Sequence, residues 1–212
     1  MNNFTIVDKC IGLIAKRNSG KSVLLKHLVN SEKHKFHKIF VLCPTEKINR
    51  FYSDIVSDEC IFDNYDEKWM NKLIDKMTEI NANKPTKERK HILLILDDCV
   101  SDTNFHQSPT IKKLFLRGRH INISLLITTQ YIYLISPSMR NNIDWVMCGQ
   151  MNQQSIFLLT NEYLSGNISK EEFVKMYNRC TKDYNFLVIN NNSVKDDDLN
   201  SVYGCIKAPD IK

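Results

Sequence analysis

The chain has 212 residues with a formal net charge of +5, and 42% of the residues are hydrophobic and 25% charged, which is typical of a soluble globular protein. This composition excludes a disordered or collagen-like chain, and no apolar run approaches the roughly 18 residues that a membrane-spanning helix needs. The positive charge is compatible with a polyanionic partner, but it is common among proteins that bind none.

The amino terminus and the cysteines indicate a reducing, cytosol-like compartment. Residues 1–5 contain no basic stretch that leads into a signal-like apolar run, so secretion is not expected. The seven cysteines are scattered and include no C-x-x-C pair that could bind zinc. We therefore expect reduced, buried cysteines that pack as small hydrophobic side chains.

Strand-like and helix-like segments alternate along the chain. A short apolar run between turn residues predicts a strand, and apolar residues that recur every three to four positions predict a helix. In chain order we expect a strand at 7–15, a helix at 21–29, a strand at 38–43, a helix at 66–80, strands at 92–96, 121–127 and 145–148, helices at 153–164 and 170–180, and a strand at 184–189. This alternation predicts an α/β fold with a mostly parallel central sheet and helices on both of its faces.

Two of these segments carry further signals. Residues 92–96 are apolar at every position, as expected of a central strand that is covered on both faces. Asp66 stands where the helix at 66–80 needs an N-cap. We expect a single domain over residues 1–192, followed at 193–212 by a tail or a short terminal helix, because that stretch shows little periodicity.

A phosphate-binding loop is predicted where the first strand meets the first helix. There, successive backbone N–H groups can surround a phosphate chain at the positive end of the helix dipole. Gly20 permits close approach of the backbone, Lys21 supplies charge to the β and γ phosphates, and the Ser22 hydroxyl is a ligand for Mg²⁺. The full loop is Ala15, Lys16, Arg17, Asn18, Ser19, Gly20, Lys21 and Ser22. Because Ala15 replaces the first glycine of the G-x-x-x-x-G-K-[ST] pattern, the alternative at this stage is an ordinary turn.

The central strand ends in two acids that fit a magnesium-dependent hydrolase. Asp97 is the expected Mg²⁺ ligand, directly or through water. Asp98 is placed to orient and deprotonate an attacking water. The alternative is that the two residues cap a following helix. A phosphate loop and an acidic strand end together favour ATP hydrolysis over either structural alternative.

The next strand has polar or charged residues at both of its ends. Gln130 follows its carboxyl end, the edge of a parallel sheet that faces the ligand, and is expected to contact the γ phosphate or its water. Arg117 and Arg119 precede its amino end, on the edge away from the protein's own nucleotide. An arginine there is placed to act on the nucleotide of a neighbouring subunit, and the alternative is surface ion pairing or helix capping.

With these elements in this order, the chain resembles the genome-packaging ATPases of nucleocytoplasmic large DNA viruses, within the FtsK/HerA superfamily of P-loop ATPases. The resemblance spans residues 6–189, and its most specific part is the segment 116–130. There Arg119 lies eleven positions before Gln130, as in the family's pattern, which selects Arg119 as the arginine-finger candidate and leaves Arg117 as runner-up. The departures are Ala15 and Asp98, where many members of the superfamily carry Gly and Glu.

The resemblance implies a RecA-like P-loop domain of the additional-strand class that binds ATP and Mg²⁺. It further implies a homo-oligomeric ring, of five or six subunits, that translocates double-stranded DNA into a preformed viral capsid and has capsid components as partners. Such a protein is expected in the cytoplasm of the infected cell, with retention in the virion as an alternative, and without a membrane span. The basic segments 33–38 and 84–91 are interpreted as solvated loops, with contact to DNA phosphates as the alternative.

Other functions remain open on the sequence. A motor of the same superfamily that serves DNA transfer or segregation would carry the same residues. A small-molecule kinase has a similar length and loop, but gives Gln130 no role. An ATP-gated adaptor would not need Asp98 or Arg119, and a GTPase would need an Asn-Lys-x-Asp type guanine-binding motif after a strand, which Thr181-Lys182-Asp183 does not provide.

Overall fold

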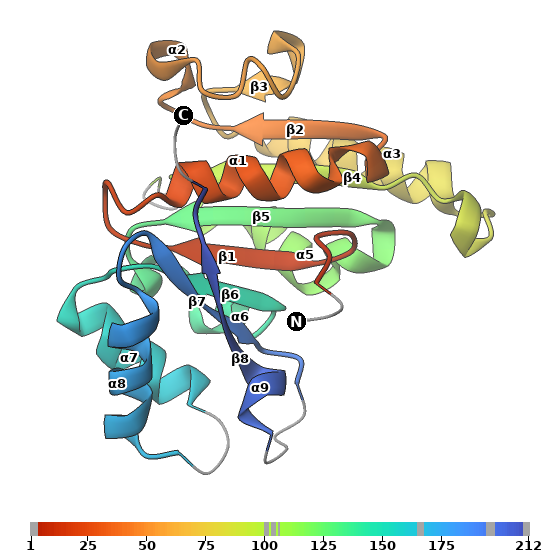
Figure 1. The fold of residues 1–212 in the computed structure, drawn as a ribbon. Coiled ribbons are helices and arrows are strands. Elements are labelled where there is room, and N and C mark those ends of the chain that lie inside the picture. Colours follow the sequence, from red (N-terminus) through yellow and green to blue (C-terminus); the bar gives the residue numbers. More distant parts are fainter. Residues whose placement is uncertain are drawn as a thin grey trace.

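The apolar runs of the sequence form the strands of one sheet (Figure 1). The computed structural model describes residues 4–99, 102, 105, 107–164, 168–193 and 198–209. Within these ranges the strands are β1 (Cys10–Ile14), β2 (Lys38–Leu42), β3 (Ile61–Phe62), β4 (Ile92–Asp97), β5 (Ile123–Thr129), β6 (Trp145–Cys148), β7 (Asn185–Asn190) and β8 (Tyr203–Lys207). The helices are α1 (Lys21–Glu32), α2 (Glu46–Asn49), α3 (Glu67–Asn81), α5 (Pro109–Arg117), α6 (Pro137–Arg140), α7 (Gln153–Tyr163), α8 (Lys170–Cys180) and α9 (Leu199–Val202).

The order of the strands places one strand between the strand that leads into the phosphate loop and the strand that ends in the two acids. Among the described residues the sheet has eight strands in the order β3-β2-β4-β5-β1-β6-β7-β8. In this spatial order, all neighbouring strands from β3 through β2, β4, β5 and β1 to β6 pair in parallel. Strand β7 pairs antiparallel with both β6 and β8. Strand β5, which follows Asp97 and Asp98 in the chain, lies between β4, which ends in these acids, and β1, which leads into the phosphate loop. The mostly parallel α/β sheet of the additional-strand class is thus confirmed.

Side chains that alternate along the central strands fill two cores. On β4, Leu94 and Leu96 pack in the cluster that contains buried residues of α3 and α5. Leu93 and Ile95 point the other way and pack in the cluster that contains α1. Figure 1 shows α1 in front of the sheet and α3 and α5 behind it. A strand that is covered on both faces needs an apolar residue at every position, which explains the uninterrupted apolar run.

Several helix and strand bounds follow the sequence prediction closely. Asp66 is the N-cap of α3, and its side chain accepts hydrogen bonds from the backbone N of Lys68 and Trp69 at 2.8 and 3.0 Å. Strand β6 and helix α8 have the predicted bounds. No helix within the described ranges combines the length and the apolar character that a membrane crossing requires.

Helix α5 was missed in the sequence, although it carries a recognisable start. Ser108 is its N-cap and accepts hydrogen bonds from the backbone N of Thr110 and Ile111 at 3.1 and 3.2 Å. Pro109 occupies the first helical position, where its missing N–H costs nothing. A Ser-Pro pair followed by apolar residues at helical spacing was therefore the available signal.

The carboxyl-terminal stretch contributes an edge strand as well as a short helix. The sequence predicted a tail or short helix at 193–212, and α9 is such a helix. Strand β8, which follows it, was not expected. It pairs antiparallel with β7, with Cys205 opposite Leu187. Only Tyr203 is buried in this strand, so its apolar pattern is too weak to predict it.

The expectation that all cysteines are reduced is corrected by the structure. Cys180 and Cys205 form a disulfide that joins the end of α8 to β8, across 25 residues of sequence. Sequence spacing cannot reveal this pairing, because the fold of the intervening β7 brings the two residues together. The other five cysteines are free and buried, as expected: Cys10, Cys43, Cys60, Cys99 and Cys148.

Candidate active site

The predicted phosphate loop leaves the carboxyl end of β1 and is fixed by backbone hydrogen bonds to its neighbours. Ala15 N donates to Thr129 O at 3.1 Å, at the end of β5. Lys16 N donates to Gln150 O at 2.7 Å, just beyond β6. The Ser19 hydroxyl closes the turn by donating to Lys16 O at 2.7 Å. The loop therefore starts from a position that the two strands beside β1 define.

Gly20 makes the transition from the loop to α1. Its φ of +84° lies in the left-handed region, which a glycine adopts at little cost. Helix α1 begins at Lys21 without a capping side chain. The first-turn N–H groups of a helix have no intrahelical partner, and together with the helix dipole they favour an anion. The local backbone thus has the form that phosphate binding requires.

A cavity of about 900 Å³ lies over this loop. It brings together the loop, the acidic end of β4 and Gln130, as the sequence predicted, and adds residues from distant parts of the chain. Its lining residues are Lys16, Arg17, Asn18, Ser19, Gly20, Lys21, Ser22, Val23, Cys43, Thr45, Glu46, Phe51, Asp97, Asp98, Gln130, Tyr184, Ala208 and Pro209. The volume falls in the range of small-molecule sites, so a nucleotide fits the space.

Three side chains donate hydrogen bonds to Asp97. Tyr52 Oη donates to its Oδ2 at 2.9 Å, Cys43 Sγ donates to the same oxygen at 3.6 Å, and the Thr128 hydroxyl donates to its Oδ1. Burial, followed by the charge of Asp97, raises the pKa of Tyr52 well above its usual value, so the phenol stays protonated and keeps donating. These contacts hold the carboxylate of Asp97 in one orientation.

Asp98 is hydrogen-bonded to residues at the carboxyl end of β5. Its backbone has a φ of +55°, which turns the chain sharply after β4. Its backbone N donates to Thr128 Oγ1 at 3.2 Å, and its Oδ2 accepts from Gln130 Nε2 at 3.2 Å. The predicted acid and the predicted amide therefore meet at the same edge of the sheet, beside the phosphate loop.

Lys21 lies in the electrostatic field of both acids. Burial lowers the pKa of its ammonium group below the usual value, while the negative charges of Asp98 and Asp97 oppose this shift. A bound polyphosphate would bring further negative charge to the same place and favour the charged form. The cavity therefore places two carboxylates beside Lys21, and two further cations of the loop, Lys16 and Arg17, also line it.

The sequence missed the cavity residues that come from loops. Cys43 follows β2 at the carboxyl edge, so the rule that located Gln130 could also have found it. Tyr184 was expected only as the first residue of the strand at 184–189, and Ala208 lies in a stretch without periodicity; the folded chain brings both to the phosphate loop. Tyr52, which contacts Asp97, also lies in a segment without periodicity. No sequence pattern marks these three residues as part of the site.

Arg119 lies at the other edge of the sheet, away from this cavity. It belongs to the 3₁₀ turn η4 (Gly118–Ile121), which precedes β5. Its side chain is half exposed, and its Nη1 lies 3.5 Å from Oδ1 of the buried Asp144. The guanidinium therefore lies at the amino end of β5, paired with Asp144, and cannot reach the nucleotide site of its own chain.

The two other candidate arginines differ in their surroundings. Arg117 ends α5 and is exposed. Arg140 is buried; it pairs with Glu162 and donates to the backbone carbonyls of Ile132 and Ile135. A guanidinium held in this way is a structural element of its own subunit, so Arg140 is not available to a neighbour.

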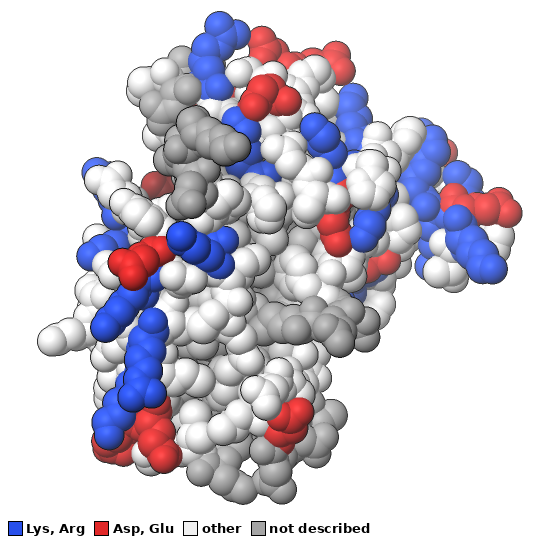
Figure 2. All heavy atoms as spheres, in the orientation of Figure 1, with Lys and Arg blue, Asp and Glu red and all other residues white. Residues whose placement is uncertain are grey.

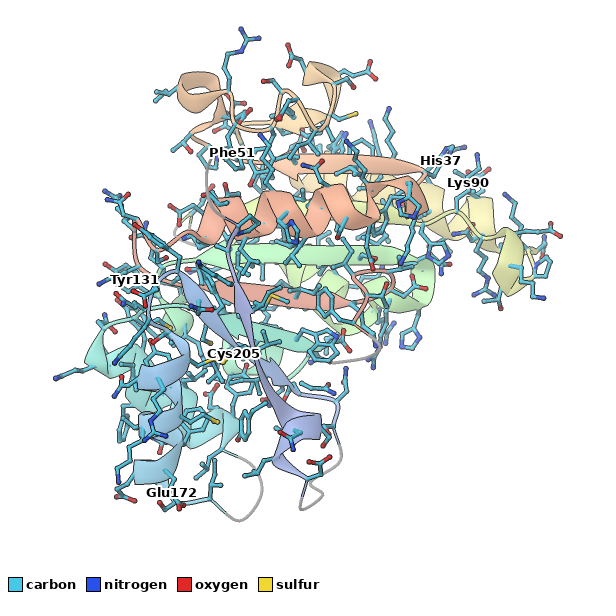
Figure 3. The ribbon with its side chains drawn as sticks, viewed as in Figure 1. His37, Phe51, Lys90, Tyr131, Glu172 and Cys205 are labelled. Carbon is cyan, nitrogen blue, oxygen red and sulfur yellow. A yellow bond between two sulfur atoms is a disulfide. The ribbon has the colours of Figure 1, made fainter. Side chains whose placement is uncertain are left out.

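The basic segments 33–38 and 84–91 meet at the same edge as Arg119. His37 N donates to His91 O at 2.8 Å, and Lys90 Nζ lies 3.3 Å from His37 Nε2 (Figure 3). Figure 2 shows lysines and arginines, with acidic side chains among them, on the part that projects to the right. Two stretches that the sequence separates thus form one basic surface at the amino ends of β2 and β4.

Comparison with known proteins agrees with this fold and site. B204, the DNA-packaging ATPase from Sulfolobus Turreted Icosahedral Virus, superposes with a TM-score of 0.66 at 22% identity, over 96% of this chain and 98% of B204. B204 from Sulfolobus turreted icosahedral virus 2 in complex with AMPPCP gives a TM-score of 0.65 at 20% identity, over 95% of this chain and 98% of that chain. At this identity the likeness shows a shared P-loop ATPase fold.

Sequence relatives come from large DNA viruses. Protein 075L of Invertebrate iridescent virus 6 is 33% identical over 196 residues, which cover 91% of this chain and 74% of the relative. The model of the family described as "Poxvirus A32 protein" matches residues 3–211. The match spans the phosphate loop, the two acids, Arg119 and Gln130 alike, and the chain therefore belongs to the Poxvirus A32 protein family.

Proposed function

We propose that this protein is an ATP-hydrolysing motor that translocates double-stranded viral DNA into a preformed capsid. The observation that carries the proposal is the cavity in which Lys21, Asp97, Asp98 and Gln130 surround the phosphate loop. Membership of the Poxvirus A32 protein family and the fold shared with the DNA-packaging ATPase B204 support it. The unit that would perform this function is the domain expected over residues 1–192 together with β8 and the residues that follow it, since β8 joins the sheet and Ala208 and Pro209 line the cavity.

The residues present fit a magnesium ion together with ATP. Ser22 offers a hydroxyl and Asp97 a carboxylate, which are oxygen ligands of the kind that Mg²⁺ takes alongside substrate phosphates and water. When bound, Mg²⁺ would neutralise phosphate charge. Asp98 would then accept a proton from the attacking water, and Gln130, which already donates to Asp98, would orient that water.

Arg119 completes the proposed site in a neighbouring subunit. Its place at the amino end of β5 separates it from its own cavity, and half of its side-chain surface is exposed. In a homo-oligomeric ring of five or six subunits, this edge would meet the nucleotide edge of the next copy. An arginine that enters there stabilises charge on the γ phosphate in the transition state.

Double-stranded DNA and capsid components are the proposed partners, and the cytoplasm of the infected cell is the proposed location. The basic surface formed by segments 33–38 and 84–91 would contact DNA phosphates. Such contacts carry no sequence information, which suits a motor that must move along any part of a genome.

The test is the rate of ATP hydrolysis per subunit as a function of protein concentration, at low salt, with and without duplex DNA. A shared site predicts a rate that rises with concentration until the ring has assembled, because the cavity of an isolated subunit receives no Arg119 from a neighbour. Duplex DNA should raise the rate further, and added salt should remove that gain. A rate per subunit that is independent of concentration and of DNA would contradict the proposal.

A further inference from the structure

The cavity continues past the phosphate loop, on the side away from the acids. Along the sheet, β4 with Asp97 and β5 lie on one side of β1, and β6, β7 and β8 lie on the other. A triphosphate that lies in the loop with its γ end toward Asp98 must therefore extend its base toward β7 and β8. The lining residues on that side are Tyr184, Ala208 and Pro209.

We propose that Tyr184 and the Ala208–Pro209 segment form the nucleobase subsite of this cavity, with the Tyr184 ring as the stacking surface. This inference rests on the proposed ATPase function and names the residues that hold the base. Tyr184 is 60% exposed, so the residue is accessible to a ligand. Stacking on an aromatic ring is a common way to hold a base, because every base has a π-face.

Tyr184 is held directly against the phosphate loop. A methyl group added at Gly20 would lie 3.2 Å from Cδ1 of the Tyr184 ring and 3.2 Å from Cβ of Ala208. Both walls of the proposed subsite thus lie beside Gly20 of the loop, close enough that an added methyl group would meet them. Figure 1 shows the chain after β8 leading toward the amino end of α1, in agreement with these contacts.

The backbone at Tyr184 is strained in the way that ligand-binding positions often are. Asp183 and Tyr184 have φ values of +51° and +61°, two successive left-handed residues of which neither is glycine. Each such residue costs about 1 kcal/mol or more and persists only where the surroundings impose it. Here Ala208 N donates to Tyr184 O at 3.0 Å. The disulfide between Cys180 and Cys205 joins the segments that lead to the two walls.

Phe51, the other aromatic residue of the cavity, lies on the opposite side. Its ring packs edge-on against Tyr52, which donates to Asp97. Figure 3 shows Phe51 near β2, whereas Cys205 marks β8 on the far side of α1. Phe51 is therefore placed beside the γ end of a nucleotide and not beside its base.

The test compares the binding of ATP with that of inorganic tripolyphosphate, which lacks the base, in the presence of Mg²⁺. Tyr184→Ala should raise the Kd for ATP roughly 10-fold, the lower part of the range for loss of one stacked base, and leave the Kd for tripolyphosphate unchanged. Tyr184→Phe, which keeps the ring, should bind ATP as the wild type does. The matched control is Tyr133→Ala, since Tyr133 is 42% exposed and does not line the cavity.

A similar rise in the Kd for both ligands would overturn the inference, because it would mean that Tyr184 only supports the loop. Unchanged ATP binding would also overturn it. Photolabelling with 8-azido-ATP gives an independent measure: the label should appear in the peptide that contains Tyr184, and a label confined to the Phe51 peptide would contradict the proposal. Wild-type protein that binds neither ATP nor tripolyphosphate would refute the proposed function itself, so the two failures can be told apart.

Discussion

Lys21→Ala should abolish ATP binding and, with it, hydrolysis. Lys21 is the lysine at the amino end of α1 that lines the cavity beside both acids. Removing its ammonium group takes away the positive charge that interacts with Asp97 and Asp98, although Lys16 and Arg17 still line the cavity. The phosphate chain and the two carboxylates then repel one another more strongly, because the site is partly buried. Isothermal titration with ATP and Mg²⁺ should show no measurable heat of binding.

Lys76→Ala is the matched control for this variant. Lys76 lies on α3, outside the cavity, and its Nζ pairs with Glu79 at 3.2 Å on the surface. Surface pairs of this kind contribute at most about 1 kcal/mol, so the control should fold and bind ATP normally. Wild-type ATP affinity in Lys21→Ala would show that the loop does not hold the phosphates.

Asp98→Asn should leave ATP bound and stop its hydrolysis. The asparagine keeps the size of the side chain and one oxygen to accept from Gln130, but it cannot take a proton from water. Loss of a general base typically lowers kcat by about 100- to 10,000-fold. Quenched-flow or steady-state phosphate release would measure the loss, and equilibrium binding of ATP would establish that the site is intact.

Asp58→Asn serves as the control for a carboxylate outside the cavity. Its Oδ2 lies 3.6 Å from Arg50 Nη2, and both side chains are largely exposed. Turnover should be unaffected. If Asp98→Asn hydrolysed ATP as fast as this control, another group would have to be the base, and Asp98 would act only through its hydrogen bond to Gln130.

The central sheet could be predicted from the sequence because its signals are local. An apolar run such as β4 can be buried on both faces in only a few ways, and its acidic end then falls at the ligand edge. The same rule located Gln130 beside Asp98, although 32 positions separate them. Arg119 was placed at the opposite edge by its position before β5.

What the sequence did not reveal depends on contacts between distant segments. Tyr52 reaches Asp97 from a loop that has no periodicity. Tyr184 and Ala208 meet at the loop only because β8 adds to the edge of the sheet, and β8 itself has a weak pattern. The disulfide between Cys180 and Cys205 depends on the same addition. Such contacts arise from topology, which residue spacing alone does not encode.

The central claim is that each phosphate loop is one half of a site that Arg119 of a neighbouring copy completes. An Arg119→Ala subunit keeps an intact loop, and a Lys21→Ala subunit keeps an intact arginine; each variant alone should hydrolyse no ATP. Arg117→Ala, which removes an exposed guanidinium two positions earlier, should retain turnover and serves as the control.

The decisive measurement is the ATPase rate of Arg119→Ala and Lys21→Ala subunits mixed at different ratios in the presence of duplex DNA. Random assembly at equal amounts pairs an intact loop with an intact arginine at about a quarter of the interfaces, so hydrolysis should return to a maximum near that ratio. An absence of hydrolysis at every ratio, in mixtures shown to co-assemble, would contradict a site shared between subunits.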